Sequence, residues 1–342
     1  MRKLLVVAIG VVLAAAPLGA KVQVVTTLSA YASIANAVGG DRVEAVSISR
    51  GDEDAHFVKP KPSYALMLKR ADLFVTTGLD LELWAPVVVD KSGNKSIRDG
   101  QPGFVSASQG VSMLDVPESV SREGGDVHIF GNPHIHTSPL NAKIIAANIV
   151  AGLKRVDPDG AAIYDVNLAQ FNQRLSEKLY GKDLVELLGA EALDPLARQG
   201  KLIEFLSAQE YEGESLIERL GGWMGKALVF RGRQLVAYHK NWTYFTHLFG
   251  LEVAGYVERK PGIPPSARHV LHLLNLIEDS EIRVLWASSY FSQEKVQSIA
   301  ERAGCQAMIV SLGPMTVTAD SYFELIENWI DDLAEAFAGE QL

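Results

Sequence analysis

Apolar and polar positions follow two different rhythms along the chain from Lys21 onward. Short runs rich in β-branched residues, which predict strands, alternate with stretches that have apolar residues at helical spacing. This alternation predicts an α/β fold with mainly parallel sheets. The predicted strands are residues 21–27, 42–49, 71–77, 227–230, 234–238, 251–257, 283–287 and 307–310, and the predicted helices are 30–38, 62–70, 141–153, 161–188, 242–249, 266–277, 293–303 and 321–337.

Three longer segments interrupt the alternation and divide the chain. Residues 91–131 are polar and glycine-rich, and residues 191–223 have a mostly helical pattern with no clear strand signal. Residues 161–188 form one long amphipathic stretch, which predicts a helix able to join two lobes. We therefore expect an N-terminal lobe over residues 21–155, a linking helix over 156–190 and a C-terminal lobe over 191–342.

The first 20 residues have the features of a secretory signal peptide. Arg2 and Lys3 precede an apolar run over residues 4–16, and small residues end the segment at Ala20. The apolar run is shorter than the roughly 20 residues that a membrane-spanning helix needs. We expect export with cleavage near Ala20, and, since no cysteine lies near that point, a periplasmic protein without a lipid anchor.

Composition and charge exclude some classes of binding partner and exclude disulfide bonds as a source of stability. The 342 residues are 48% apolar and 21% charged, which is ordinary for a globular protein of two domains. Cys305 is the only cysteine, so an intramolecular disulfide is impossible. The formal charge of −9, or −11 without Arg2 and Lys3, argues against nucleic acid or an anionic membrane as partner.

Three of the eight histidines lie near predicted strand ends or among turn-forming residues: His56, His134 and His239. Ligands of open α/β sheets bind at the carboxyl ends of strands. A single histidine in such a place is more often a hydrogen-bonded surface or core residue. Three together, with a fourth donor, make a tetrahedral zinc site, and a nearby carboxylate is expected to offset the charge of the ion.

Four segments, in order through both halves of the chain, carry a resemblance to a known family. The first is residues 54–63, in which a histidine precedes a proline and then Pro-Ser at a helix start; residues 71–74 and 78–82 continue it. The others are Asn132-Pro133-His134 with Asn141-Ala142, then residues 238–242, then residues 258–266. Together they resemble the periplasmic metal-binding component of zinc and manganese ABC importers, the cluster A-I or cluster 9 binding proteins.

The resemblance implies a fold, a partner and a role. It implies two lobes, each with a four-stranded parallel sheet flanked by helices, joined by one long helix, with the ion buried where the lobes meet. The ligand is carried unchanged to an inner-membrane ABC permease, and the carrier is expected to be a monomer. A rigid connecting helix restricts hinge closure, so we expect small lobe and loop shifts on release.

The chain departs from the family at the fourth ligand. Many relatives place an aspartate after the last strand of the second lobe, where this chain has Ser311, a poor zinc donor. Three histidines and a water molecule are the leading prediction, with Asp54, Glu210 or Asp320 as rival donors; Asp320 equally fits a helix start, where a carboxylate binds free amides. Imidazole donors favour zinc over manganese, although a manganese or iron type of the same transport class is the alternative.

Two further histidines stand close to the expected site in sequence. An extended segment would point His134 and His136 the same way, but the family usually has an aromatic at the second position, so we place His136 at the lip of the site. His128 could help to capture the metal. His247, His269 and His272 fall in helical stretches and are expected to be surface or packing residues.

Two other classes of protein fit the sequence less well. A secreted zinc hydrolase is suggested by His134-Ile135-His136, but Thr137-Ser138-Pro139 adds no ligand and no general base is evident. No His-Glu-x-x-His run occurs. An adhesion or scaffolding protein would need an anchor that the sequence does not offer. We therefore predict a carrier and not an enzyme.

Overall fold

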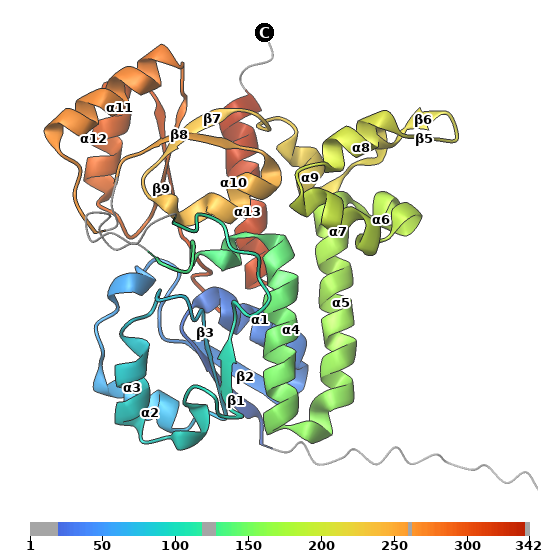
Figure 1. The fold of residues 1–342 in the computed structure, drawn as a ribbon, viewed down its shortest axis with the longest axis vertical. Coiled ribbons are helices and arrows are strands. Elements are labelled where there is room, and N and C mark those ends of the chain that lie inside the picture. The colour runs from blue at the N-terminus through green and yellow to red at the C-terminus, as the bar shows by residue number, and fades with distance from the viewer. Residues whose placement is uncertain (1–19, 118–127, 259–261, 339–342) are drawn as a thin grey trace, which may run out of the picture.

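The computed structural model describes residues 20–117, 128–258 and 262–338. They form two lobes, each built on a four-stranded sheet, which lie one above the other in Figure 1. The expected signal peptide lies outside the described residues except for Ala20. Among the helices of the described ranges, none has the length and apolarity that a membrane crossing demands.

The sheet of the N-terminal lobe has four parallel strands in the order β2-β1-β3-β4. Its last strand and helix α3 have no counterpart among the predicted elements. The strand is only three residues long, which is too short for an alternating pattern to be recognised. The strands are β1 (Val22–Thr26), β2 (Val43–Ser47), β3 (Leu73–Thr76) and β4 (Phe104–Ser106).

Helices cover both faces of this sheet, as a parallel sheet requires. Alternate strand residues point to opposite layers: Val24 and Val75 belong to the core with α1 and α4, whereas Val25 and Phe74 pack with α2 and α3. Helices α2 and α4 both begin with proline, whose fixed φ suits a first turn. The helices are α1 (Ser29–Gly39), α2 (Pro62–Lys69), α3 (Ala85–Ser92) and α4 (Pro139–Val156).

The sheet of the C-terminal lobe repeats this plan in the order β10-β9-β7-β8, again parallel. Leu235 and Trp286 face the layer of α10 and α13, and Val236 and Leu285 face α11 and α12. The elements are β7 (Gln234–Ala237), α10 (Thr243–Phe249), β8 (Glu252–Tyr256), α11 (Ala267–Asp279), β9 (Val284–Ser288), α12 (Gln293–Ala303), β10 (Gln306–Val310) and α13 (Ser321–Ala338).

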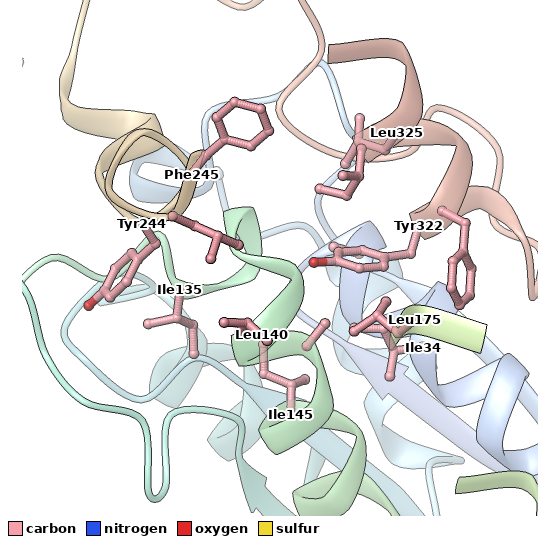
Figure 2. Close-up of a cluster of buried hydrophobic side chains, with 14 of the residues drawn as sticks. Ile34, Ile135, Leu140, Ile145, Leu175, Tyr244, Phe245, Tyr322 and Leu325 are labelled. Carbon is pink, nitrogen blue, oxygen red and sulfur yellow. The ribbon is translucent and has the colours of Figure 1, made fainter. Parts of the chain in front are cut away.

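The inner layers of the two lobes merge into one hydrophobic core. Figure 2 shows where they meet: Ile34 and Leu140 of the N-terminal lobe lie beside Phe245 and Tyr322 of the C-terminal lobe, and all four belong to one continuous buried cluster. The outer layers form two separate clusters, one per lobe. Wide separation of the lobes would expose the shared core to water, so the packing favours small movements.

Helix α5 (Ala161–Tyr180) runs along the side of the molecule from the base of the N-terminal lobe toward the other lobe (Figure 1). The prediction of one helix over residues 161–188 is wrong in its second part, because the helix ends before Gly181 and α6 (Lys182–Leu188) follows. Gly181 has φ +85°, and a Cβ there would lie 3.0 Å from the Cα of Gly221. Both conditions require glycine.

Residues 181–221 leave the two-lobe plan and form what we call the helical excursion, which projects to the right in Figure 1. The expectation of a mostly helical segment misses a short antiparallel hairpin of two-residue strands within it. Its elements are α6, α7 (Ala190–Arg198), α8 (Leu202–Ala208), β5 (Glu210–Tyr211), β6 (Glu214–Ser215) and the 3₁₀ turn Leu216–Arg219.

The strand predicted over residues 227–230 is also wrong. Ala227 ends helix α9 (Gly222–Ala227), and Leu228 and Val229 lie in a turn with 40% and 42% of their surface exposed. A four-residue apolar run does not distinguish a strand from a helix end. Here the exposed side chains of Leu228 and Val229 do not belong to the hydrophobic core.

Candidate metal centre

His56, His134 and His239 meet between the lobes, at the carboxyl ends of both sheets. His56 lies in a 3₁₀ turn that follows β2, His134 directly precedes the 3₁₀ turn Ile135–Thr137, and His239 follows β7. One possible ligand atom from each lies within 4.8 Å of those of the other two. His134 and His239 are only 2% and 5% exposed. The three predicted ligands are therefore brought together and shielded from water.

The two histidines of the N-terminal lobe are oriented by the same local motif. The Oδ1 atom of Asp54 accepts hydrogen bonds from the main-chain N–H of His56 at 3.0 Å and from its Nδ1 at 2.7 Å. Asn132 Oδ1 accepts from the same two atoms of His134, each at 2.9 Å. A short Asp or Asn side chain bonding two residues ahead is a turn-forming contact. In both rings it leaves Nε2 as the nitrogen that can bind a metal.

His239 of the C-terminal lobe lies against a carboxylate from a neighbouring strand, although its Nδ1 has no partner in hydrogen-bond geometry among the described residues. Glu258 follows β8, and its main-chain N–H donates to the Tyr238 carbonyl at 2.8 Å, which places Glu258 beside β7. Its Oε2 lies 2.9 Å from Nδ1 of His239, and the Glu258 side chain is 10% exposed. Sequence reasoning missed Glu258 as a partner of the site, because only the β7–β8 pairing brings it there.

The charge and protonation of these groups suit a divalent cation. Burial, followed by the neighbouring rings of His56 and His239, holds the pKa of His134 well below its ordinary value, so the ring is neutral at pH 7. Neutral imidazole is the form that binds metal. The carboxylates of Asp54 and Glu258 each touch a ligand ring, so two negative charges stand beside the place of a doubly charged ion.

His128 also reaches the centre. Its Nε2 lies 3.0 Å from Nε2 of His56, and its ring is 6.5 Å from the ring of His134 between centroids. Two nitrogens on one tetrahedral zinc, with Zn–N about 2.0–2.1 Å, are about 3.3 Å apart. His128 is therefore near enough to His56 to share an ion with it, but among the described residues only His56, His134 and His239 have ligand atoms that all lie within 4.8 Å of one another, so His128 stands beside the group of three.

His136 is buried beside the site. It is 3% exposed, its Nε2 donates to the Leu312 carbonyl at 3.2 Å, and its Nδ1 is buried with no hydrogen-bond partner among the described residues. The segment is a 3₁₀ turn and not the extended strand in which His134 and His136 would point the same way. Burial lowers the pKa of His136 to about 4.

The other acidic candidates are placed elsewhere. Asp320 pairs with Arg174 at the surface, with 56% of its side chain exposed, and Glu210 lies exposed in β5. The segment at Ser311 approaches the centre through its main chain: the N–H groups of Leu312 and Gly313 donate to the Gly51 carbonyl at 3.0 and 3.2 Å. Of the four further candidates, Asp54 contacts the His56 ring, His128 lies beside His56, and His136 lines the adjoining cavity, whereas Asp320 lies away from the centre.

A small cavity adjoins the histidines. His56, His134 and His136 line it together with Asp54 and Tyr290, and its volume is about 20 Å³. A space of this size holds one ion or water molecule and no organic solute. His239 does not line this cavity, which therefore lies on the His56 and His134 side of the three histidines.

Comparison with known proteins identifies the family. The family model described as the zinc-uptake complex component A, periplasmic, matches residues 24–179 and 208–336. The iron-binding protein YfeA of Yersinia pestis is 26% identical over 321 residues, which cover 93% of this chain and 86% of YfeA. The high-affinity zinc uptake system protein ZnuA of Bacillus subtilis (strain 168) is 22% identical over 86% of this chain and 79% of its own.

Solved structures show the same fold. A zinc-bound deletion mutant of ZnuA has a TM-score of 0.68 at 20% identity and covers 93% of this chain and 98% of its own. The binding protein FpvC of Pseudomonas aeruginosa with Ni²⁺ has a TM-score of 0.64 at 20% identity, covering 94% of this chain and 98% of its own. The predicted fold class is confirmed by both likenesses and by the two parallel four-stranded sheets.

Both lobes and all three histidines fall within the stretches that the family model matches, whereas residues 180–207, which include α6 and α7, fall between them. The match extends over well more than half of the chain. The chain therefore belongs to the family of periplasmic component A proteins of zinc-uptake complexes, the metal-binding components of ABC importers.

Proposed function

We propose that this protein captures Zn²⁺ through the Nε2 atoms of His56, His134 and His239 and delivers it to an inner-membrane ABC permease. The observation that carries the proposal is the common orientation of the three rings. Nδ1 of His56 and Nδ1 of His134 each donate to a side-chain oxygen, of Asp54 and Asn132, and Nδ1 of His239 lies 2.9 Å from Oε2 of Glu258 without hydrogen-bond geometry. Each ring then has Nε2 left for the ion. Such oxygen partners fix the ring orientation and raise the basicity of metal-binding histidines.

We assign the fourth position to His128. In the metal-free protein its Nε2 can donate to Nε2 of His56, because His56 gives its own ring hydrogen to Asp54. On ion binding, the contact between the two Nε2 atoms would be replaced by a bond from each of them to the metal. On this proposal His128 takes the place of the expected water molecule, and Asp54 remains the partner of His56 and not a ligand.

Four imidazoles favour zinc over manganese, which prefers oxygen donors. The relatives named above are an iron-binding protein, a zinc uptake protein and a binding protein solved with Ni²⁺, so the family alone does not decide the metal. Copper would bind such a set more tightly in principle, and availability in the cell favours zinc.

A carrier fits the site better than a hydrolase. Asp54 and Glu258 both contact ligand rings, so neither is free to act as a general base on a metal-bound water. Export through the predicted signal peptide, and handover of the ion without chemical change, belong to the same proposal. Metal-dependent hydrolysis of activated esters or peptides by the purified protein would count against it.

Zinc titration of the purified mature protein with a competing chelator tests the assignment. We expect one zinc per chain, tighter binding of Zn²⁺ than of Mn²⁺, and a loss of more than about 100-fold in affinity for His56→Ala, His134→Ala or His239→Ala, because even partners of ligands are worth about 10–100-fold. His269→Ala is the matched control, since that ring donates to the Tyr256 carbonyl outside the site. Full binding after two of the three ligands are replaced would refute the proposal.

The fourth ligand has its own test. We expect His128→Ala to weaken zinc binding by about 10–100-fold and to change the visible spectrum of the Co²⁺ form, because one nitrogen donor is exchanged for water. If His128→Ala left the zinc affinity and the Co²⁺ spectrum unchanged, His128 would not be a ligand and water would be the fourth donor.

A further inference from the structure

Asn132 occupies an unusual place, between the two lobes and between two of the histidines. Its residue is 5% exposed, and it lies two positions before His134 in the segment that leads to the 3₁₀ turn Ile135–Thr137. Its main-chain N–H donates to the Leu114 carbonyl at 2.8 Å, which fixes the segment within the N-terminal lobe. The oxygen and the nitrogen of its side-chain amide make hydrogen bonds to different lobes.

The oxygen end of the amide serves the N-terminal lobe. Oδ1 accepts from both the main-chain N–H and Nδ1 of His134, as Asp54 does for His56. This bond determines which way the His134 ring points, and through it the place of Nε2.

The nitrogen end serves the C-terminal lobe. Nδ2 donates to the Lys240 carbonyl at 2.8 Å and to Oγ1 of Thr243 at 2.9 Å, with Oδ2 of Asp115 farther away at 3.3 Å. Lys240 directly follows His239, and Thr243 begins α10. The Asn132 carbonyl also accepts from the Tyr244 hydroxyl at 2.7 Å. The amide therefore joins the segment of one ligand to the segment of another across the cleft.

Only an amide can make both contacts at this length. An aspartate would keep the acceptor for His134 but would turn a second oxygen toward the Lys240 carbonyl and the Asp115 carboxylate. Asp54, which holds His56 in the same way, has no such donor and needs none, because its described hydrogen bonds stay within its own turn. The Asp54–His56 and Asn132–His134 motifs thus differ in one atom, Nδ2 of Asn132, which makes the hydrogen bonds to the other lobe.

From these contacts, and on the basis of the zinc site proposed above, we propose that Asn132 is a positioning residue that couples the orientation of His134 to the distance between the lobes. When the lobes separate, Nδ2 loses the Lys240 carbonyl, the amide is free to rotate, and the His134 ring loses its fixed direction. Zinc is then released by a small separation at this bond, with no disruption of the shared core.

The test compares Asn132→Asp and Asn132→Ala with Asn148→Asp. Asn148 is a matched control because its Nδ2 also donates to two carbonyls, of Ala107 and Gln109, but entirely within the N-terminal lobe. Stopped-flow transfer of zinc to a chelator measures the dissociation rate, and the Co²⁺ spectrum reports the arrangement of the ligands.

For Asn132→Asp we expect zinc dissociation about 10–100-fold faster with a retained Co²⁺ spectrum, because His134 keeps its acceptor. For Asn132→Ala we expect faster dissociation and an altered spectrum, and for Asn148→Asp neither. Dissociation from Asn132→Asp at the rate of the unaltered protein, or an equal acceleration in Asn148→Asp, would overturn the inference.

A measurement without metal separates this inference from the zinc assignment. Spin labels at Lys69→Cys on α2 and Gln297→Cys on α12, in a Cys305→Ser background, report the distance between the outer layers of the two lobes. Asn132→Asp should broaden the distance distribution of the metal-free protein and Asn148→Asp should not. An unchanged distribution in Asn132→Asp would overturn the coupling even if the protein bound no zinc.

Discussion

The two lobes share a sheet topology but hold their histidines by different means. In the N-terminal lobe, His56 and His134 are each oriented by a side chain two residues earlier in the same loop. In the C-terminal lobe, His239 is in contact with Glu258, which is more distant in sequence and arrives through the pairing of β7 with β8. Local support depends on the conformation of one loop, whereas support across strands depends on the whole sheet.

The largest expected effect concerns the buried loop of the N-terminal lobe. His136 has its pKa lowered to about 4 by burial, against about 6.5 in an unfolded chain, so the unfolded state binds the proton first as the pH falls. The free energy of unfolding should therefore decrease between pH 6.5 and pH 4, by about 3 kcal/mol from this residue. Urea denaturation of the metal-free protein at pH 7 and pH 4.5 measures it.

The matched variant is His136→Gln, whose amide can still donate to the Leu312 carbonyl but does not titrate. It should lose less stability between the two pH values than the unaltered protein. If both proteins lost the same free energy of unfolding between pH 7 and pH 4.5, protonation of His136 would not destabilise the folded state, contrary to what its burial predicts.

The next prediction compares the two carboxylates directly. Glu258→Ala should weaken zinc binding by about 100-fold and Asp54→Ala by about 10-fold, at the two ends of the range for partners of metal ligands. The difference is expected because the Asp54 side chain is 24% exposed, so water can replace it, whereas Glu258 is 10% exposed. Chelator competition at pH 7 gives both affinities, and a larger loss for Asp54→Ala would reverse the comparison.

The smallest effect should come from a contact behind the site. Arg198 of the helical excursion donates to the Leu140 carbonyl at 2.7 Å and reaches Oδ1 of Asn141 at 3.3 Å, which supports the start of α4. Arg198→Met should lower the free energy of unfolding by about 1 kcal/mol, as for a partly exposed charged hydrogen bond. Zinc affinity should change less than about threefold.

The exposed Lys201→Met provides the control for Arg198→Met, because both substitutions remove one positive charge from the excursion. A strong loss of zinc binding in Arg198→Met alone would mean that the excursion supports the ligand loop and not only the helix.

The features that could be predicted from the sequence are those that depend on local contacts, and the features that could not are those that depend on long-range contacts. The α/β alternation and the three histidines were predicted, because strands, helices and turn-rich ligand segments each leave a local pattern. Asp54 could be named because it lies two residues from His56. Glu258 could not, because its role needs the register of β7 against β8, and the break at Gly181 could not, because it depends on contact with Gly221.

The N–H of Gly221 donates to the Tyr180 carbonyl at 2.9 Å, so the helical excursion leaves the molecule and returns to it at nearly one point. Because the two ends of the excursion meet, its length does not determine the spacing of the two lobes. The entropic cost of closing a loop also rises only slowly with the number of residues in it. The excursion can therefore vary in length without moving the lobes apart, provided that its buried side chains, such as Leu184 and Leu193, keep their places in the shared core.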